Sequence, residues 1–187
     1  FQVFLTSYDQ GGAFLDRSKL QLGSFSPGAY ISDGKSIQLM GDPLRDFSSL
    51  LPTLGCHTAS LSDKWKVWKL SMRLKQASDD EIWNATESTS IEYLKNQGFS
   101  ESMIERFFRP FFGGVFLDDQ LSVSSRLFEY LFKRFATGLA ALPAKGMEAI
   151  PKSMSQHLYR DSILLNTRVA SLDGDQVVLE TGERLRA

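Results

Sequence analysis

Residues 106–117 read RFFRPFFGGVFL, the densest aromatic stretch of the chain. Five of these residues are phenylalanines, and a proline and two adjacent glycines interrupt them. Rings in such numbers predict a packed core, because each ring buries a large apolar area. They also suit the wall of an apolar ligand pocket, where Gly113 and Gly114 would let the backbone approach closely. The residues alone leave both interpretations open.

Helix-forming patterns surround this stretch on both sides. Ser60 with Asp63, and Thr89 with Glu92, have the spacing of capping boxes, which mark helix starts. Pro110 lacks an amide hydrogen and is expected to end the helix that precedes it. We therefore expect helices over residues 42–51, from residue 60 onward, and over 89–98, 100–109, 124–136 and 147–159.

Strand patterns occupy the two ends of the chain. Apolar and β-branched runs predict strands at residues 2–8, 20–22, 29–32 and 36–40 near the start, and at 163–165, 168–172, 176–180 and 184–186 near the end. Asp33-Gly34 and Asp173-Gly174 have the composition of hairpin turns. A helical block between two strand blocks predicts the α+β class, with a mixed or antiparallel sheet and a helical layer.

The helix that begins at Ser60 is two-sided. An apolar side is formed at steps of three and four residues by Leu61, Trp65, Trp68 and Met72. The remaining positions are rich in the cations Lys64, Lys66, Lys69, Arg73 and Lys75. The basic positions are either a solvated helix face or a contact surface for an acidic membrane or protein partner.

Composition excludes several function classes. The formal net charge is -1 and the acids and bases are interspersed, so nucleic-acid binding has no electrostatic support. No apolar run approaches the roughly 20 residues that span a bilayer. Cys56 is the only cysteine and is expected in or near the core, which weakly favours a reducing, cytoplasmic compartment with a peripheral membrane contact left open. His57, His157 and the acidic run 79–81 show no metal-ligand spacing, and no residue stands out as catalytic.

The two ends of the chain resemble interrupted strands. Residues 1–5 read FQVFL without an initiator methionine, and residues 184–187 stop as a strand begins. We expect the chain to be an internal piece of a larger protein.

Several segments taken in order resemble the flavin-containing amine oxidase superfamily, in particular its phytoene-desaturase-like and protoporphyrinogen-oxidase-like members. The segments that carry this resemblance are residues 25–29, 41–43, 107–117, 125–128, 142–147, 166–169, 176–179 and 181–183. Together they cover nearly the whole chain.

The resemblance implies a fold with two parts. Residues 1–140 would form the substrate-binding domain, and 141–187 would form part of the FAD-binding domain, with a helix and a β-meander. FAD is the implied cofactor, although the glycine-rich loop that holds its phosphates is absent from this chain. Gly146 would lie at a turn near the cofactor, and Val169 would meet the adenine through backbone groups.

The implied function is the oxidation of an apolar or amine substrate by hydride transfer to flavin. Alone, the chain is expected to be inactive. Aromatic character nominates four substrate-binding residues, Tyr30, Phe111, Phe112 and Phe116. Two rival functions remain: a non-catalytic binding module for an apolar ligand such as a carotenoid, porphyrin or lipid, and a partner-binding domain that uses the basic helix around Trp65. The oligomeric state is not indicated.

Overall fold

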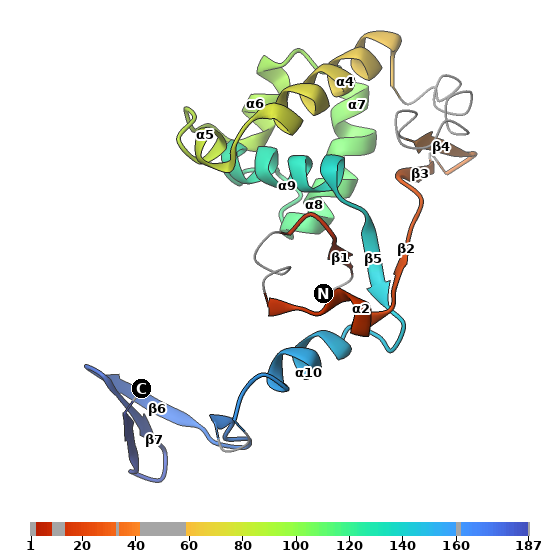
Figure 1. Cartoon of the computed structure of the whole chain (residues 1–187). Coiled ribbons are helices and arrows are strands. Elements are labelled where there is room, and N and C mark those ends of the chain that lie inside the picture. Colours follow the sequence, from red (N-terminus) through yellow and green to blue (C-terminus); the bar gives the residue numbers. More distant parts are fainter. Residues whose placement is uncertain (1–2, 9–13, 33, 42–58, 160–161, 187) are drawn as a thin grey trace.

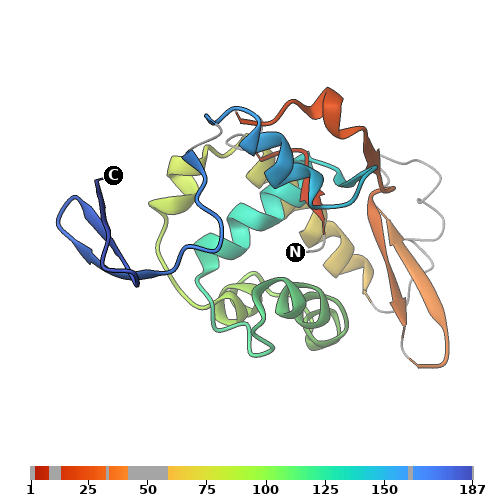
Figure 2. The same cartoon turned by 90° about the horizontal axis from the view of Figure 1, so that it is seen from below.

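A computed structural model of the chain describes residues 3–8, 14–32, 34–41, 59–159 and 162–186. Helices α4 to α9 gather in one layer, and small antiparallel sheets lie beside and below it (Figure 1). The hairpin of β3 and β4 and the meander of β6, β7 and β8 lie at opposite ends of the molecule (Figure 2). The α+β class is confirmed in general. The expected helix at 42–51, Cys56 and His57 lie outside the described residues.

Phenylalanine side chains form the centre of the core of the helical layer. It contains α4 (Leu61–Gln76), α5 (Asp79–Trp83), α6 (Ser90–Asn96) and α9 (Ser125–Thr137). The centre of the core between these helices is filled by three fully buried rings, Phe108, Phe112 and Phe128. Their centroids lie 4.7–6.3 Å apart. Such spacing is typical of favourable tilted and edge-to-face ring packing. The core interpretation of residues 106–117 is therefore confirmed for Phe108 and Phe112.

Pro110 does not end the helix that contains it, contrary to the expectation from sequence. Three elements follow without a break: α7 (Glu101–Met103), the π-helical turn η2 (Ile104–Phe108) and α8 (Arg109–Phe116). The amide of Arg109 donates to the carbonyl of Ile104, five residues back. This wide turn moves the preceding carbonyls away from the proline ring, which would clash with them in a regular α-helix. The phenylalanines before and after Pro110 therefore lie on one helical segment.

Polar side chains join the helices at their first turns. Asp63 completes the expected capping box of α4 and also accepts hydrogen bonds from the amide and hydroxyl of Ser100, the N-cap of α7. The Ser125 amide at the start of α9 donates to Ser88 O, and the Ser90 hydroxyl at the start of α6 donates to Val123 O. Pairs of helix starts are therefore fixed to each other through groups that would otherwise lack partners.

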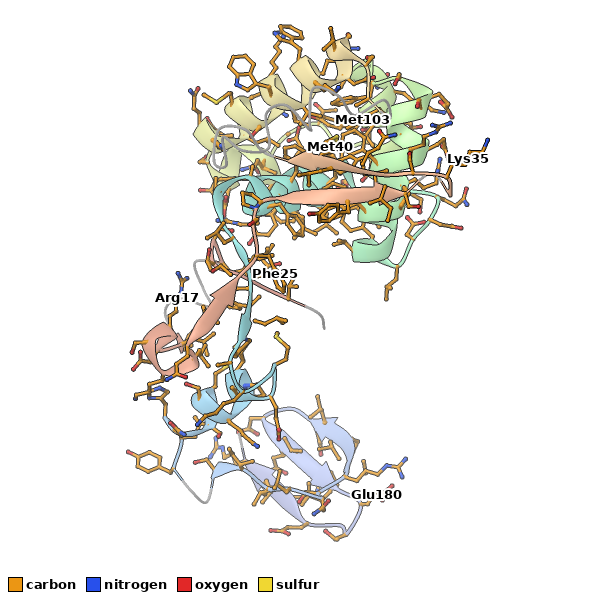
Figure 3. The ribbon with its side chains drawn as sticks, turned by 90° about the vertical axis from the view of Figure 1, so that its right-hand side faces the viewer. Arg17, Phe25, Lys35, Met40, Met103 and Glu180 are labelled. Carbon is orange, nitrogen blue, oxygen red and sulfur yellow. The ribbon has the colours of Figure 1, made fainter. Side chains whose placement is uncertain are left out.

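The N-terminal strands belong to two separate sheets. In the first, β5 (Ala140–Pro143) lies between β1 (Phe4–Leu5) and β2 (Leu22–Ser24). The second is the hairpin of β3 (Gly28–Ser32) and β4 (Ile37–Gly41), which confirms the strands expected on either side of Asp33-Gly34. It lies along the helical layer, with Met40 packed against the core that contains Met103 and Lys35 at the turn of the hairpin (Figure 3).

Two strand expectations need correction. The strand expected at residues 20–22 begins only at Leu22, the first residue of β2, because Leu20 ends the short helix α2 (Arg17–Leu20), which Asp16 caps at the Ser18 amide, and Gln21 follows with φ +47°. The strand expected at residues 163–165 is wrong, since these residues contain no strand. Short patterns of this kind are ambiguous by periodicity.

The C-terminal part contains α10 (Ala149–Ser155) and the meander of β6 (Val169–Asp173), β7 (Gln176–Leu179) and β8 (Arg184–Arg186). Both turns of the meander contain a glycine at positive φ, Gly174 at +62° and Gly182 at +84°, as the sequence predicted. Pro151 is tolerated because it lies in the first turn of α10. The division into domains at residues 140 and 141 stays a prediction. That boundary falls within β5.

Candidate functional site

The core phenylalanines have a half-buried edge. Phe107 and Phe111 stack at a centroid distance of 5.9 Å with an interplanar angle of 4°, and Phe135 meets Phe111 edge-on at 5.1 Å. All three rings are partly exposed, whereas the neighbouring Phe112 is buried. We call these three residues the aromatic strip. It offers flat apolar surface that the fold leaves accessible.

The predicted substrate residues on α8 lie at different depths. Phe111 is part of the aromatic strip. Phe112 is 1% exposed and contacts Phe108, Phe116, Phe128, Phe132 and Phe135, so in this chain it packs the core. Phe116 is partly buried, one turn further along, with its ring 5.6 Å from that of Phe112. Substrate contact by these residues stays a prediction.

Tyr30 lies on the exposed face of the β3–β4 hairpin, opposite the face that packs against the helices. It pairs with Leu39 and is 78% exposed, whereas Ile31, next to it on β3, is buried. Because neighbouring residues of a strand point to opposite faces, Tyr30 points away from the face that carries Ile31 and Met40. Met40 packs against the helical core. The structure therefore does not bring Tyr30 together with Phe111, Phe112 and Phe116.

Gly146 occupies a tight turn between β5 and α10. Its amide donates to Pro143 O at 2.9 Å, its carbonyl accepts from Ala149 N at 3.1 Å, and its φ is +80°. No atom lies within 4 Å of the position that a Cβ would take. The Gly146 amide is therefore already bonded within the turn, while the Cα side is open to the close approach of another molecule.

Val169 begins strand β6 and is 50% exposed. Every residue of β6 is exposed, and the pairing with β7 is irregular between Val169 and Ser171. The residue before it is already engaged, because Arg168 O accepts a hydrogen bond from Glu180 N at 3.0 Å. The strand has surface available for a further contact, and the role of Val169 toward a cofactor stays a prediction.

A hydrogen-bonded group of titratable side chains, Arg73, Tyr93 and Glu129, connects three helices of the helical layer. Burial raises the pKa of Tyr93, and the nearby Glu129 carboxylate raises it further, so the phenol stays protonated at neutral pH. Arg73 donates to both the Tyr93 hydroxyl and Glu129, which joins α4, α6 and α9. In the described part of the chain, no group of three or more His, Cys, Asp or Glu side chains is placed to hold a metal ion.

The chain matches the family model for flavin containing amine oxidoreductases over residues 1–187. The chain belongs to this family. Its general type is therefore that of a flavin-dependent oxidoreductase, with flavin as the cofactor of the family. No curated protein and no solved structure matches the chain.

Sequence reasoning missed two of the three residues of the aromatic strip. Phe107 lies within residues 106–117, where nothing in the sequence separates it from its aromatic neighbours. Phe135 could have been found from α9, where Phe128, Phe132 and Phe135 repeat at steps of four and three. Phe107 and Phe111 are four residues apart, so a continuous helix through Pro110 places them on one face, whereas the proline predicted a helix end between them.

Proposed function

We propose that the protein oxidises an apolar or amine substrate by hydride transfer to FAD, and that this chain forms the apolar wall of the substrate site. The aromatic strip is the observation that carries the proposal. Two of its rings stack, the third meets one of them edge-on, and all three are partly exposed on the helical layer, in a chain of a flavin-dependent family. Flat rings on a rigid support suit an apolar substrate that must be held in one orientation.

The residues nominated for the cofactor fit it in part. Gly146 offers an open Cα side, which a side chain would obstruct, and Val169 offers exposed strand surface. When bound, flavin supplies the acceptor for the two electrons and the hydrogen that leave the substrate. The contribution of this chain is to orient the substrate carbon, to keep water away from it and to admit the cofactor at the turn of Gly146.

A matched pair of glycine variants tests the cofactor contact. Gly146→Ala and Gly182→Ala both place a side chain at φ near +80° with open space around it, so their local strain is similar. In the full-length protein that contains this chain, visible flavin absorbance measures how much cofactor is retained. We expect Gly146→Ala to lower it and Gly182→Ala to leave it unchanged. Equal retention by both variants would remove Gly146 from the cofactor site.

The substrate wall is tested by Phe111→Leu. Anaerobic bleaching of the flavin by a series of apolar amines and polyenes gives the concentration that half-saturates reduction. Loss of ring stacking, about 0.5–1.5 kcal/mol, should raise that concentration by about two- to twelvefold. Leu117→Ala, at a fully exposed position just after α8, is the control. A change no larger than that of the control would contradict the role of the strip.

The rival function, a binding module for an apolar ligand, shares the same rings. It predicts a full-length protein that stays colourless after added FAD and still binds a carotenoid or porphyrin. That result would replace the oxidoreductase proposal.

A further inference from the structure

Helix α4 exposes the side that sequence periodicity marks as apolar. Leu61, Trp65 and Trp68 are 72%, 57% and 47% exposed. The helix instead buries Leu70 and Leu74, which pack toward the core. We call Leu61, Trp65 and Trp68 the tryptophan face. A row of large exposed apolar side chains on one helix indicates a contact surface, because single exposed residues would be scattered.

Cations border this face. Between residues 61 and 76 the helix carries five basic residues and one acid, Asp63. Asp63 is fully buried and bonded to the helix starts, so it does not offset the exposed charge. Lys69 lies over the ring of Trp65, with its Nζ 5.4 Å from the ring centroid. The exposed side of α4 is therefore apolar in its middle and positive at its border.

A shallow groove of about 150 Å³ opens beside the tryptophan face. Trp65, Lys66, Lys69 and Arg73 line it from α4, and Phe99 lines it from the opposite side. Lys66 donates to the carbonyl of Gly98, which holds the two sides together. A negatively charged group that enters the groove would lie beside Lys66 and Lys69, while Arg73 at the end of the groove is already paired with Glu129.

We propose that the tryptophan face and its border of cations dock the protein onto an anionic lipid surface. Indole rings favour the boundary between lipid headgroups and acyl chains, and lysines beside them are attracted to anionic headgroups. A lipid phosphate or carboxylate would occupy the groove next to Lys69. The position of α4 agrees, because the helix forms the outer edge of the helical layer (Figure 1). None of the helices in the described ranges is long and apolar enough to cross a bilayer.

The test is co-sedimentation with vesicles of phosphatidylcholine, either alone or enriched in phosphatidylserine. We expect binding only to the phosphatidylserine vesicles, with a blue shift of tryptophan fluorescence. Lys69→Glu reverses one charge at the surface and should weaken binding at least tenfold, since each basic residue near an anionic surface contributes a several-fold gain in affinity. Trp65→Ala combined with Trp68→Ala should abolish both the binding and the blue shift.

Two controls match these changes elsewhere on the molecule. Lys152→Glu makes the same charge reversal on α10, and Leu172→Ala removes an exposed apolar side chain from the meander. Both should bind vesicles like the unchanged chain, and circular dichroism should show all variants folded. The proposal is overturned if the unchanged chain ignores phosphatidylserine vesicles. It is equally overturned if the α4 variants bind as well as the controls, as they would if this face served a protein partner.

Discussion

The buried carboxylate of Asp63 is predicted to make a large contribution to the free energy of unfolding. Its carboxylate is fully buried and accepts four hydrogen bonds: from Ser60 N at 3.1 Å, Ser60 Oγ at 2.6 Å, Ser100 N at 2.9 Å and Ser100 Oγ at 2.7 Å. The change to test is Asp63→Asn, which keeps the size of the side chain. An amide has one oxygen where the carboxylate has two, and its NH₂ group cannot accept a hydrogen bond.

The magnitude follows from these contacts. The two serine hydroxyls can rotate to accept from the new NH₂ group, but one backbone amide, of Ser60 or of Ser100, must lose its acceptor. A buried amide without a partner costs about 1–3 kcal/mol. The hydrogen bonds that remain also lose the assistance of a full charge. We therefore expect the free energy of unfolding to fall by about 3 kcal/mol at neutral pH.

The effect should depend on pH in one direction. Burial raises the pKa of Asp63, but the hydrogen bonds from Ser60 and Ser100 outweigh it, so the pKa in the folded state lies below its ordinary value. A group of this kind stabilises the fold fully above the unfolded-state pKa of about 3.9, and the contribution is lost as pH falls through the lower folded-state pKa. The stability difference between the unchanged chain and the Asp63→Asn variant should therefore be constant down to about pH 5 and shrink below about pH 4.

Urea unfolding followed by tryptophan fluorescence at a series of pH values measures this difference. Glu92→Gln is the matched control, because Glu92 has the same role in the capping box of α6 but is exposed. It should destabilise the chain far less. The reasoning would be refuted if the two variants were equally stable at neutral pH, or if the Asp63→Asn difference did not shrink in acid.

Two further predictions concern packing. Gly138→Ala should lower the free energy of unfolding by about 2 kcal/mol or more, since its Cβ would lie 2.6 Å from the backbone nitrogen of Ser7. Gly114→Ala, on α8 with open space around it, should instead stabilise the chain by about 0.5–1 kcal/mol. Phe112→Ala should cost about 3–5 kcal/mol by emptying the centre of the core, while the same change at half-buried Phe111 should cost clearly less. Thermal or chemical unfolding checks all four variants, and reversal of either order would contradict the packing described.

Local chemistry explains which elements were foreseen. The capping boxes at Ser60 and Thr89 and the meander turns at Gly174 and Gly182 appear as expected. Each depends on bonds or backbone angles within a few residues, so the residue types are sufficient to predict it. The family resemblance is confirmed across the whole chain. It depends on the order of short segments along the sequence and not on how those segments pack.

The remaining features depend on contacts between distant residues. Whether the apolar side of α4 faces the core or the solvent depends on which neighbour it meets, and its periodicity is the same in both cases. Pro110 continues its helix because a wide turn precedes it, and this continuity lets Phe107 and Phe111, four residues apart, stack on one face. The sequence by itself determined the helix starts marked by capping boxes, the hairpins and the family. Only the tertiary structure decided which rings are buried, which form an accessible strip and which helix face is left exposed, because burial is a property of the whole packed chain.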